Sequence, residues 1–409
     1  MKVLWFTNTP SNYLEESRGY NGGGWISSLE NEISSKVELA VAFVMNGQEG
    51  KTTRDGVVYY PIPNPYNRGR ADRVKKFLFG NAMERSWLLS CYVNVIKEFH
   101  PDIIEVFGSE HLYGLVSMYT PVPVVLHVQG ILGEHQKTFL PPDMRMCDYM
   151  MSDGTLEGYF AKKYYVTDFR RRAAIEKKIL SSIGYFFGRT EWDKKMVTAA
   201  NPSARYFHVD EVLRAPFYEN ARCWKPCGAP ILVTTISEPP YKGMDVILRT
   251  AEILYEKLGA CFRWIVYGNV NVEFFENFTG IDCDDVGVAP KGVGDADDLI
   301  RSMSDCAVYV HPSYADNSPN SVCEAQMLGV PVVASNVGGI PSLVDDGVTG
   351  LLAEVGSPED FADKILRLIS DREMALSMGL AAANAASVRH DKERIVTTMI
   401  ETYGSLIGK

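Results

Sequence analysis

A predicted helix start within residues 311–335 offers a binding site for an anion. Ser318 is a favourable N-cap and Pro319 a favourable first helical residue, so a helix is expected to begin at this point. The N–H groups of Asn320 and Ser321 would then have no acceptor within the helix. The helix dipole favours a negative group beside them, and a diphosphate suits such a site.

Two acids, Asp316 and Glu324, flank this helix start eight positions apart. A carboxylate on the helix can accept hydrogen bonds from a ribose diol, and one just before the helix can hold sugar hydroxyls. The same residues also have an ordinary structural interpretation. Ser321 and Glu324 have the spacing of a capping box, and Asp316 is a common type of turn residue. Local spacing alone leaves both interpretations open.

Lys242 is a second candidate for contact with an anion. It lies at the expected start of another helix, residues 244–258. A cation at a helix N-terminus opposes the helix dipole, so the position is mildly unfavourable for a surface lysine. This favours a functional role, in which the ammonium group neutralises charge on a bound phosphate.

Two features of the first half follow predicted strands. The glycine run Gly22, Gly23 and Gly24 precedes a predicted helix, and glycine permits close approach of the backbone to a ligand. His127 ends a short apolar run. Both features also have an ordinary interpretation, as a flexible turn and as a satisfied core histidine.

These residues lie in a chain in which short apolar runs alternate with longer amphipathic stretches. This pattern is typical of βα units and a parallel sheet. In the first half, strands are expected at residues 3–7, 37–44, 103–107, 122–128, 185–188 and 205–208, and helices at 25–34, 87–99 and 191–200. In the second half, strands are expected at 231–236, 262–267, 307–311 and 332–335, and helices at 244–258, 297–303, 320–328 and from 357 onward.

The two series are separated by residues 215–230, which contain three prolines and a glycine and show no periodicity. This stretch is expected to be an interdomain linker. The sequence therefore predicts an α/β fold with two doubly wound, Rossmann-like domains, residues 1–214 and 231–391. Such domains bind ligands at the carboxyl ends of their strands, in a cleft between them.

Residues 312–334 resemble the signature of retaining glycosyltransferases of family 4, which have the two-domain fold called GT-B. The dipeptide Pro312-Ser313, the acids at 316 and 324, and residues 329–334 (GVPVVA) match the signature, with Asp316 in place of its first glutamate. Residues 237–248 resemble the family's Arg-x5-Lys-Gly segment. Lys242 matches the lysine, but Ile236 stands where the family has arginine.

The resemblance implies a role for each matching residue in binding a nucleotide-sugar donor. Asp316 would touch the sugar, Glu324 the ribose and Lys242 the diphosphate. The glycines at 22–24 would approach the donor phosphates, and His127 would lie beside the reacting sugar.

The missing arginine leaves a place for another cation. Arg189 lies at a predicted strand end that faces the cleft, so it is a candidate replacement. Otherwise it is expected to pair with Glu191 or Asp193.

The family likeness also implies how the domains divide the work. The second domain would bind the donor and the first the acceptor, with retention of anomeric configuration. The final helix, about residues 392–407 within a segment ending at 409, is expected to cross back to the first domain. No enzyme nucleophile is evident, so departure and attack on one face of the sugar are favoured.

Composition excludes several other classes. The net charge of −10 argues against a general nucleic-acid-binding protein, and no apolar run reaches the roughly 20 residues of a membrane-spanning helix. The eight cysteines are scattered and are expected to be free thiols in a cytoplasmic protein. Asp282 and Asp284 have the Asp-x-Asp spacing of metal-dependent glycosyltransferases but lie in a polar turn, so neither a metal nor a cofactor is expected.

Charge is uneven along the chain. Residues 1–200 hold 24 Lys and Arg against 22 Asp and Glu, a net of +2, which leaves −12 for the remainder. Within the first half, residues 68–79 mix basic and aromatic residues, and Arg170, Arg171 and Arg172 form a further basic run. These residues are either solvated helix surface or a peripheral contact with anionic lipid.

The sequence therefore predicts a metal-independent glycosyltransferase that uses a nucleotide sugar, with UDP favoured over GDP. The expected acceptor is a glycan or a lipid-linked glycan, in surface polysaccharide synthesis. Two alternatives remain. One is a non-catalytic subunit that binds nucleotide sugars, suggested by the absent arginine and by Asp316. The other is a nucleotide-sugar epimerase of the same two-domain shape.

Overall fold

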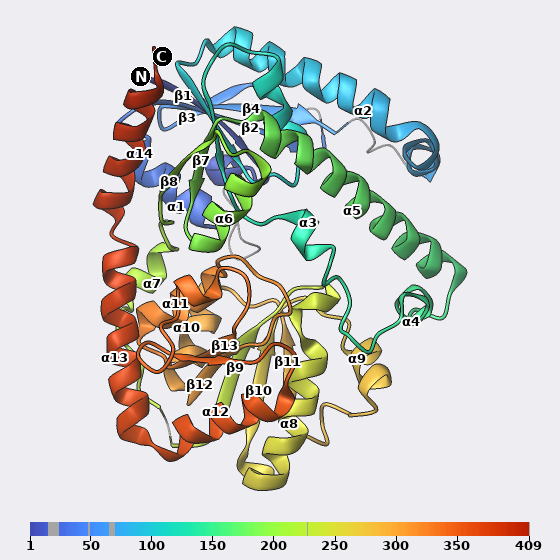
Figure 1. Ribbon diagram of the computed structural model, residues 1–409, viewed down its shortest axis with the longest axis vertical. Coiled ribbons are helices and arrows are strands. Elements are labelled where there is room, and N and C mark those ends of the chain that lie inside the picture. Colours follow the sequence, from blue (N-terminus) through green and yellow to red (C-terminus); the bar gives the residue numbers. More distant parts are fainter. Residues whose placement is uncertain (15–23, 48–49, 65–69, 227, 409) are drawn as a thin grey trace.

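A computed structural model of the chain describes residues 1–14, 24–47, 50–64, 70–226 and 228–408, apart from the side chains of residues 70–83. It consists of two α/β domains stacked one above the other (Figure 1). Each is built on one mainly parallel sheet, of eight strands in the first domain and six in the second.

The strand order of the first domain is β3-β4-β2-β1-β5-β6-β7-β8, and all pairs are parallel except β3 with β4. The strands are β1 (Lys2–Thr7), β2 (Glu38–Met45), β3 (Thr52–Arg54), β4 (Val57–Pro63), β5 (Ile103–Phe107), β6 (Val124–His127), β7 (Tyr185–Gly188) and β8 (Arg205–His208).

Alternate residues of each strand point to opposite faces of this sheet, and both faces are buried in apolar clusters. Leu4 and Phe6 of β1 join one apolar cluster, while Val3 and Trp5 join another on the opposite face. The helices of the domain are η1 (Ser11–Tyr13), α1 (Gly24–Ile33), α2 (Arg70–Phe99), η2 (Leu112–Met118), α3 (Leu132–His135), α4 (Met146–Met151), α5 (Leu156–Ser182) and α6 (Glu191–Ala200).

The hairpin of β3 and β4 is not among the strands expected from the sequence, and β4 contains two prolines, Pro61 and Pro63. The register explains why they are tolerated. β3 pairs only with residues 57–59 of β4, so the later part of β4, with both prolines, has no partner strand on that side. A proline there removes no ladder hydrogen bond.

Residues 215–230, the expected interdomain linker, lie between the two sheets and begin with a short helix, α7 (Ala215–Glu219). Pro216 lies in the first turn of α7, where the missing N–H costs nothing.

The strand order of the second domain is β11-β10-β9-β12-β13-β14, with every pair parallel. The strands are β9 (Ile231–Thr235), β10 (Arg263–Tyr267), β11 (Val288–Gly292), β12 (Val308–His311), β13 (Val332–Ser335) and β14 (Leu351–Ala353). The helices are η3 (Pro240–Lys242), α8 (Met244–Leu258), η4 (Gly259–Cys261), α9 (Val272–Thr279), α10 (Ala296–Asp305), α11 (Asn320–Leu328), η5 (Ile340–Ser342), α12 (Pro358–Ser370) and α13 (Arg372–Arg389).

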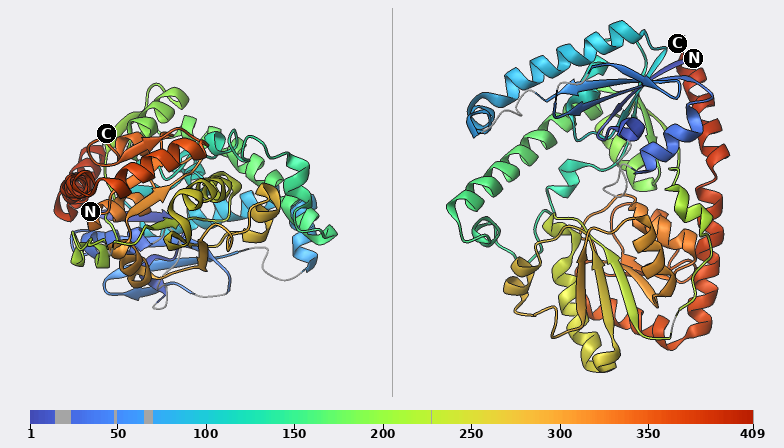
Figure 2. Two further views of the ribbon diagram at one scale, coloured as in Figure 1. Left: turned by 90° about the horizontal axis from the view of Figure 1, so that it is seen from below. Right: turned by 180° about the vertical axis from the view of Figure 1, so that it is seen from behind.

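The last helix, α14 (Lys392–Leu406), leaves the second domain and packs on the first. With α13 it forms a column along one side of both domains (Figures 1 and 2). Its apolar residues Val396, Met399 and Tyr403 belong to the same cluster as β1. The domains also meet through α3, α4 and α5, which share an apolar cluster with α8 through Leu132, Tyr149 and Phe169.

Tyr403 anchors α14 by donating its hydroxyl hydrogen to the carboxylate of Glu105, and both side chains are fully buried. Tyr403→Phe should lower the free energy of unfolding by about 1–3 kcal/mol, because it removes a partner from a buried carboxylate. Urea unfolding measures this. The exposed Tyr119→Phe is the control and should change stability by less than about 0.5 kcal/mol. Equal effects of the two substitutions would contradict the anchoring role.

Candidate active site

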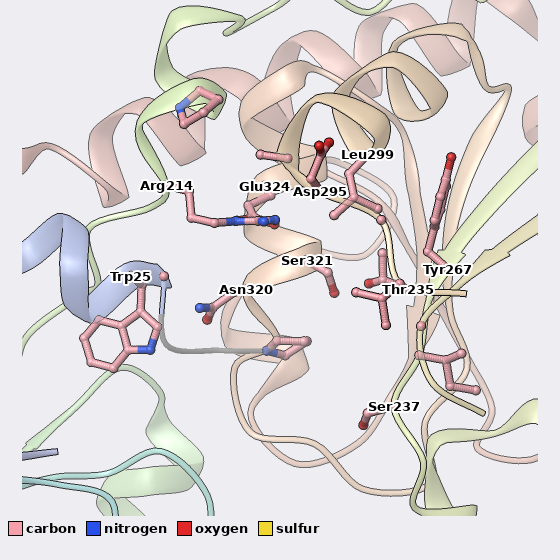
Figure 3. A pocket seen from close by; sticks show the side chains of 18 of the residues that line it. Trp25, Arg214, Thr235, Ser237, Tyr267, Asp295, Leu299, Asn320, Ser321 and Glu324 are labelled. Atoms are coloured by element: carbon pink, nitrogen blue, oxygen red, sulfur yellow. The ribbon is translucent and has the colours of Figure 1, made fainter. Parts of the chain in front are cut away.

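A cavity of about 770 Å³ lies between the domains, at the carboxyl ends of both sheets. The first domain contributes Trp25, Gln129 and Arg189 to its wall, and the second contributes the ends of β9, β10 and β12 and the start of α11. Figure 3 shows the side chains of this wall that surround α11.

Lys242, Asp316 and His311 form one polar cluster on the wall. The carboxylate oxygen Oδ2 of Asp316 lies 2.6 Å from Lys242 Nζ and 2.9 Å from His311 Nε2. Burial raises the pKa of Asp316, but Lys242 and His311 outweigh it and hold the pKa well below its usual range. Asp316 is therefore a carboxylate at neutral pH, able to accept sugar hydroxyls.

Gly243 allows Lys242 to take this position. Its φ of 86° lies in the left-handed region, and a Cβ atom there would lie 2.2 Å from the carbonyl oxygen of Pro312. The turn that carries Lys242 can therefore pack against the end of β12 only with glycine at 243.

The N-terminus of α11 opens onto the cavity. The helix begins at Asn320, in agreement with the expected range 320–328, but its N-cap is Pro319 rather than Ser318, and no side chain caps it. The capping-box interpretation of Ser321 and Glu324 is therefore wrong. The first N–H groups bonded within the helix are those of Val322 and Cys323, both to Pro319, which leaves the N–H groups of Asn320 and Ser321 to an outside acceptor.

Glu324 is 3% exposed and lies one turn further along α11. Its two carboxylate oxygens accept hydrogen bonds from Arg214, at 2.6 Å from Nε and 2.7 Å from Nη2. Burial raises the pKa of Glu324, and Arg214 opposes this rise. The sequence analysis missed Arg214, which lies 110 positions away at the start of α7 and matches no motif.

Arg189 also lies on the wall, but its partner is not one of the two acids expected. Its guanidinium forms an ion pair with Glu211, and its exposed fraction is 4%. Asp193 accepts hydrogen bonds from the backbone N–H groups of Arg189, at 2.9 Å, and Thr190, at 3.1 Å, rather than from the guanidinium. Glu191 is 82% exposed beside Lys194. The expected ion pair with Glu191 or Asp193 is therefore corrected to one with Glu211.

Glu211 joins Arg189 to the second domain. The amide group of Asn320 lies 2.6 and 2.8 Å from the Glu211 carboxylate oxygens when its nitrogen faces them. Glu211 has no exposed side-chain surface. One buried carboxylate thus receives donors from both domains.

The expected glycine loop is only partly described. Gly22 and Gly23 lie outside the described residues, whereas Gly24 begins α1 and lines the cavity. A Cβ atom on Gly24 would lie 2.9 Å from Cδ of Arg214, so glycine here makes room for that arginine.

His127 does not lie on the cavity wall, contrary to expectation. Its side chain is fully buried, surrounded by the rings of Trp25, Phe107 and Phe187. Its Nδ1 lies 2.9 Å from Glu105. The strand end that carries His127 is covered by Trp25, a tertiary contact that sequence spacing does not reveal.

Asp282 and Asp284 lie in the turn before β11, away from the cavity wall. Asp282 accepts a hydrogen bond from the backbone N–H of Asp284, and Cys283 between them is buried. Within the described ranges, no group of three or more His, Cys, Asp or Glu side chains has the arrangement of a metal site. None of the seven described cysteines forms a disulfide.

Residues 230–371 match the family model described as glycosyl transferases group 1. Among curated proteins, the D-inositol 3-phosphate glycosyltransferase of Corynebacterium aurimucosum is 32% identical over 155 residues, 36% of each chain. The N,N'-diacetylbacillosaminyl-diphospho-undecaprenol alpha-1,3-N-acetylgalactosaminyltransferase of Campylobacter jejuni is 28% identical over 115 residues, 28% of this chain and 30% of its own. These alignments span only about a third of each relative.

Solved structures match over nearly the whole chain. Sucrose-phosphate synthase from Thermosynechococcus elongatus has a TM-score of 0.73 at 13% identity, covering 99% of this chain and 98% of its own. HepE from Anabaena, solved in complex with UDP and glucose, has a TM-score of 0.65 at 15% identity and covers 99% and 100%. These likenesses confirm the expected two-domain fold of the GT-B glycosyltransferases.

The buried ion pair of Glu211 with Arg189 should contribute strongly to stability. Glu211→Gln should lower the free energy of unfolding by about 3–5 kcal/mol, because the buried guanidinium of Arg189 loses the carboxylate with which it forms an ion pair. Glu191→Gln is the matched control, two positions from Arg189 in the sequence but exposed, and should change stability by less than about 0.5 kcal/mol. Urea unfolding of both variants measures the difference. A change below about 1 kcal/mol for Glu211→Gln would show that the pair is not maintained in solution.

Proposed function

We propose that this chain, whose residues 230–371 match the model of the glycosyl transferases group 1, transfers a sugar from a nucleotide-sugar donor to a glycan or lipid-linked acceptor. One observation carries the proposal. Asp316 and Glu324 lie on the same cavity wall, on either side of the uncapped N-terminus of α11, with Lys242 beside Asp316.

The donor fits this arrangement group by group. Its diphosphate would bind the free N–H groups of Asn320 and Ser321, where the helix dipole favours negative charge. Its ribose hydroxyls would donate to Glu324, and its sugar hydroxyls to Asp316. We propose UDP as the nucleotide, which agrees with the UDP bound in the Anabaena structure of the same fold.

The chemistry we propose retains the anomeric configuration. The bond between the anomeric carbon and the diphosphate oxygen breaks, and the acceptor oxygen bonds to the same face of that carbon. The acceptor proton passes to the leaving diphosphate. Negative charge grows on that diphosphate as the bond breaks, and the ammonium group of Lys242, with the N–H groups of α11, stabilises it without a metal ion.

The acceptor would enter from the first domain, which forms the opposite wall of the cavity. A lipid-linked acceptor agrees with the name of the Campylobacter relative, and a small phosphorylated polyol agrees with that of the Corynebacterium relative. We favour a glycan or lipid-linked glycan, in surface polysaccharide synthesis.

The purified protein should release nucleotide from one of a panel of UDP- and GDP-sugars, and release should persist in EDTA. Liquid chromatography of the nucleotides and sugars measures both. Loss of turnover in chelator, restored by Mn²⁺ or Mg²⁺, would contradict the metal-free mechanism. Sugar interconversion without nucleotide release would indicate an epimerase, and binding without turnover a non-catalytic subunit.

We also propose a peripheral contact with anionic lipid. The helices α2 and α5 extend on the same side of the first domain, away from its sheet (Figures 1 and 2). Near the start of α5, Leu156 and Phe160 are 78% and 60% exposed, and Arg170 and Arg171 further along α5 are exposed as well. The basic stretch 68–79 begins outside the described residues and continues into α2, where side chains are not described. No helix among the described residues has the length and apolar character needed to span a bilayer.

The protein should co-sediment with phosphatidylglycerol vesicles at low salt and less at high salt, with at most about 1 kcal/mol from each basic residue. Phe160→Ser should weaken this binding because it removes an apolar group that can enter the lipid interface. Val388→Ser, on the equally exposed surface of α13, is the control and should not. Equal binding to neutral vesicles, or none to anionic ones, would refute the lipid contact.

A further inference from the structure

Every lysine and arginine on the described cavity wall already has an acidic partner. Lys242 is paired with Asp316, Arg189 with Glu211 and Arg214 with Glu324. A bound diphosphate adds negative charge to a wall on which every described cation is already paired and which also carries Asp295 and Asp297. It must therefore draw a cation away from its acid, or rely on N–H groups alone.

Ile236 is a further reason why the diphosphate needs a cation from elsewhere on the wall. It lies on the cavity wall, 7% exposed, at the position where the family resemblance places an arginine. The wall therefore presents an apolar side chain where a second cation is expected beside Lys242.

Arg189 is poorly suited to fill the vacancy. Its side chain is 4% exposed. Its partner Glu211 has no exposed side-chain surface and also accepts hydrogen bonds from the amide group of Asn320. Moving Arg189 would leave Glu211 as a buried charge without a counter-ion, and the donor offers no group to replace it. The cost of such a buried charge is several kcal/mol.

Arg214 differs in both respects. Its side chain is 24% exposed, the most accessible of the three cations, and its guanidinium lies 4.7 Å from the ring centroid of Phe217. Its partner Glu324 is the acid proposed to bind ribose. The two ribose hydroxyls can therefore replace the two guanidinium donors that Glu324 would lose, so the carboxylate stays hydrogen-bonded.

The distance that the guanidinium has to travel is short. Glu324 is the fifth residue of α11, so the open N-terminus of the helix lies about 6 Å further along its axis. Figure 3 shows Arg214 reaching toward Glu324 from the side of the cavity on which Asn320 also lies. The backbone of Arg214 is fixed before α7, and its long side chain rests against Gly24.

We propose that Arg214 supplies the second cation for the donor diphosphate, by exchanging its bond to Glu324 for one to the phosphates when ribose takes Glu324. The inference rests on the proposed function, because it assumes that a nucleoside diphosphate binds at α11. It assigns to this residue of the interdomain segment a role that no motif in the sequence indicates.

Equilibrium binding of UDP and uridine to the wild-type chain and to Arg214→Gln tests this exchange. The variant should weaken UDP binding by between about tenfold and a hundredfold, the range for a charge-assisted hydrogen bond. Uridine binding should be unchanged or tighter, because ribose no longer competes with the guanidinium for Glu324. Arg214→Lys keeps the charge but loses the two-pronged geometry, so it should retain part of the preference for UDP.

The ratio of the two affinities is the deciding quantity, because partial unfolding of a variant lowers both affinities equally. The double variant Arg214→Gln with Glu324→Gln leaves no buried charge unpaired and should show the same loss of preference for UDP. Arg145→Gln, which removes an exposed arginine paired with Asp148, is the control and should keep the wild-type ratio.

An unchanged ratio in Arg214→Gln would overturn the inference, whether both affinities fall together or neither changes. In that case Arg214 only positions Glu324. A wild-type chain that binds neither UDP nor GDP would instead contradict the proposed function, and the inference would fall with it.

Discussion

The cavity depends on charge pairing across the domain boundary, and the buried carboxylate of Glu211 is its centre. The carboxylate of Glu211 forms an ion pair with Arg189, which follows β7, and accepts hydrogen bonds from the amide group of Asn320 at the start of α11. The backbone carbonyl of Glu211 accepts a hydrogen bond from His390, between α13 and α14. A carboxylate without exposed surface must keep its donors, because losing one leaves an uncompensated charge. The position of α11 relative to the first domain therefore follows from this contact.

That placement has a consequence for ligand binding. The N-terminus of α11 carries free N–H groups, and the acids on either side of it are paired with Lys242 and Arg214. Because each described cation on this wall is paired with an acid, the wall is stable without a ligand. It can also bind a ligand that carries both hydroxyls and phosphates, because the hydroxyls can donate hydrogen bonds to the acids while the phosphates pair with the cations.

The helix column α13–α14 and the contact of α3–α5 with α8 join the domains on two sides of the cavity. Tyr403 ties α14 to Glu105 beneath the carboxyl end of β5, and the same carboxylate meets His127. The helix that leaves the second domain is thus bonded to the strand ends behind the cavity wall of the first.

The sequence by itself determined the two parallel sheets, most of their strands and the helix start at 320, because periodicity and local turn chemistry decide these features within a few residues. It also indicated Asp316 and Glu324, which lie on one segment with recognisable spacing, and Lys242, which lies on another. Only the tertiary structure decided the partners. The bond of Arg214 to Glu324 joins residues 110 positions apart, and Arg189 takes Glu211 rather than the acids beside it in sequence. Ion pairs at a domain boundary depend on which side chains are brought together and shielded from water, and no local pattern encodes that.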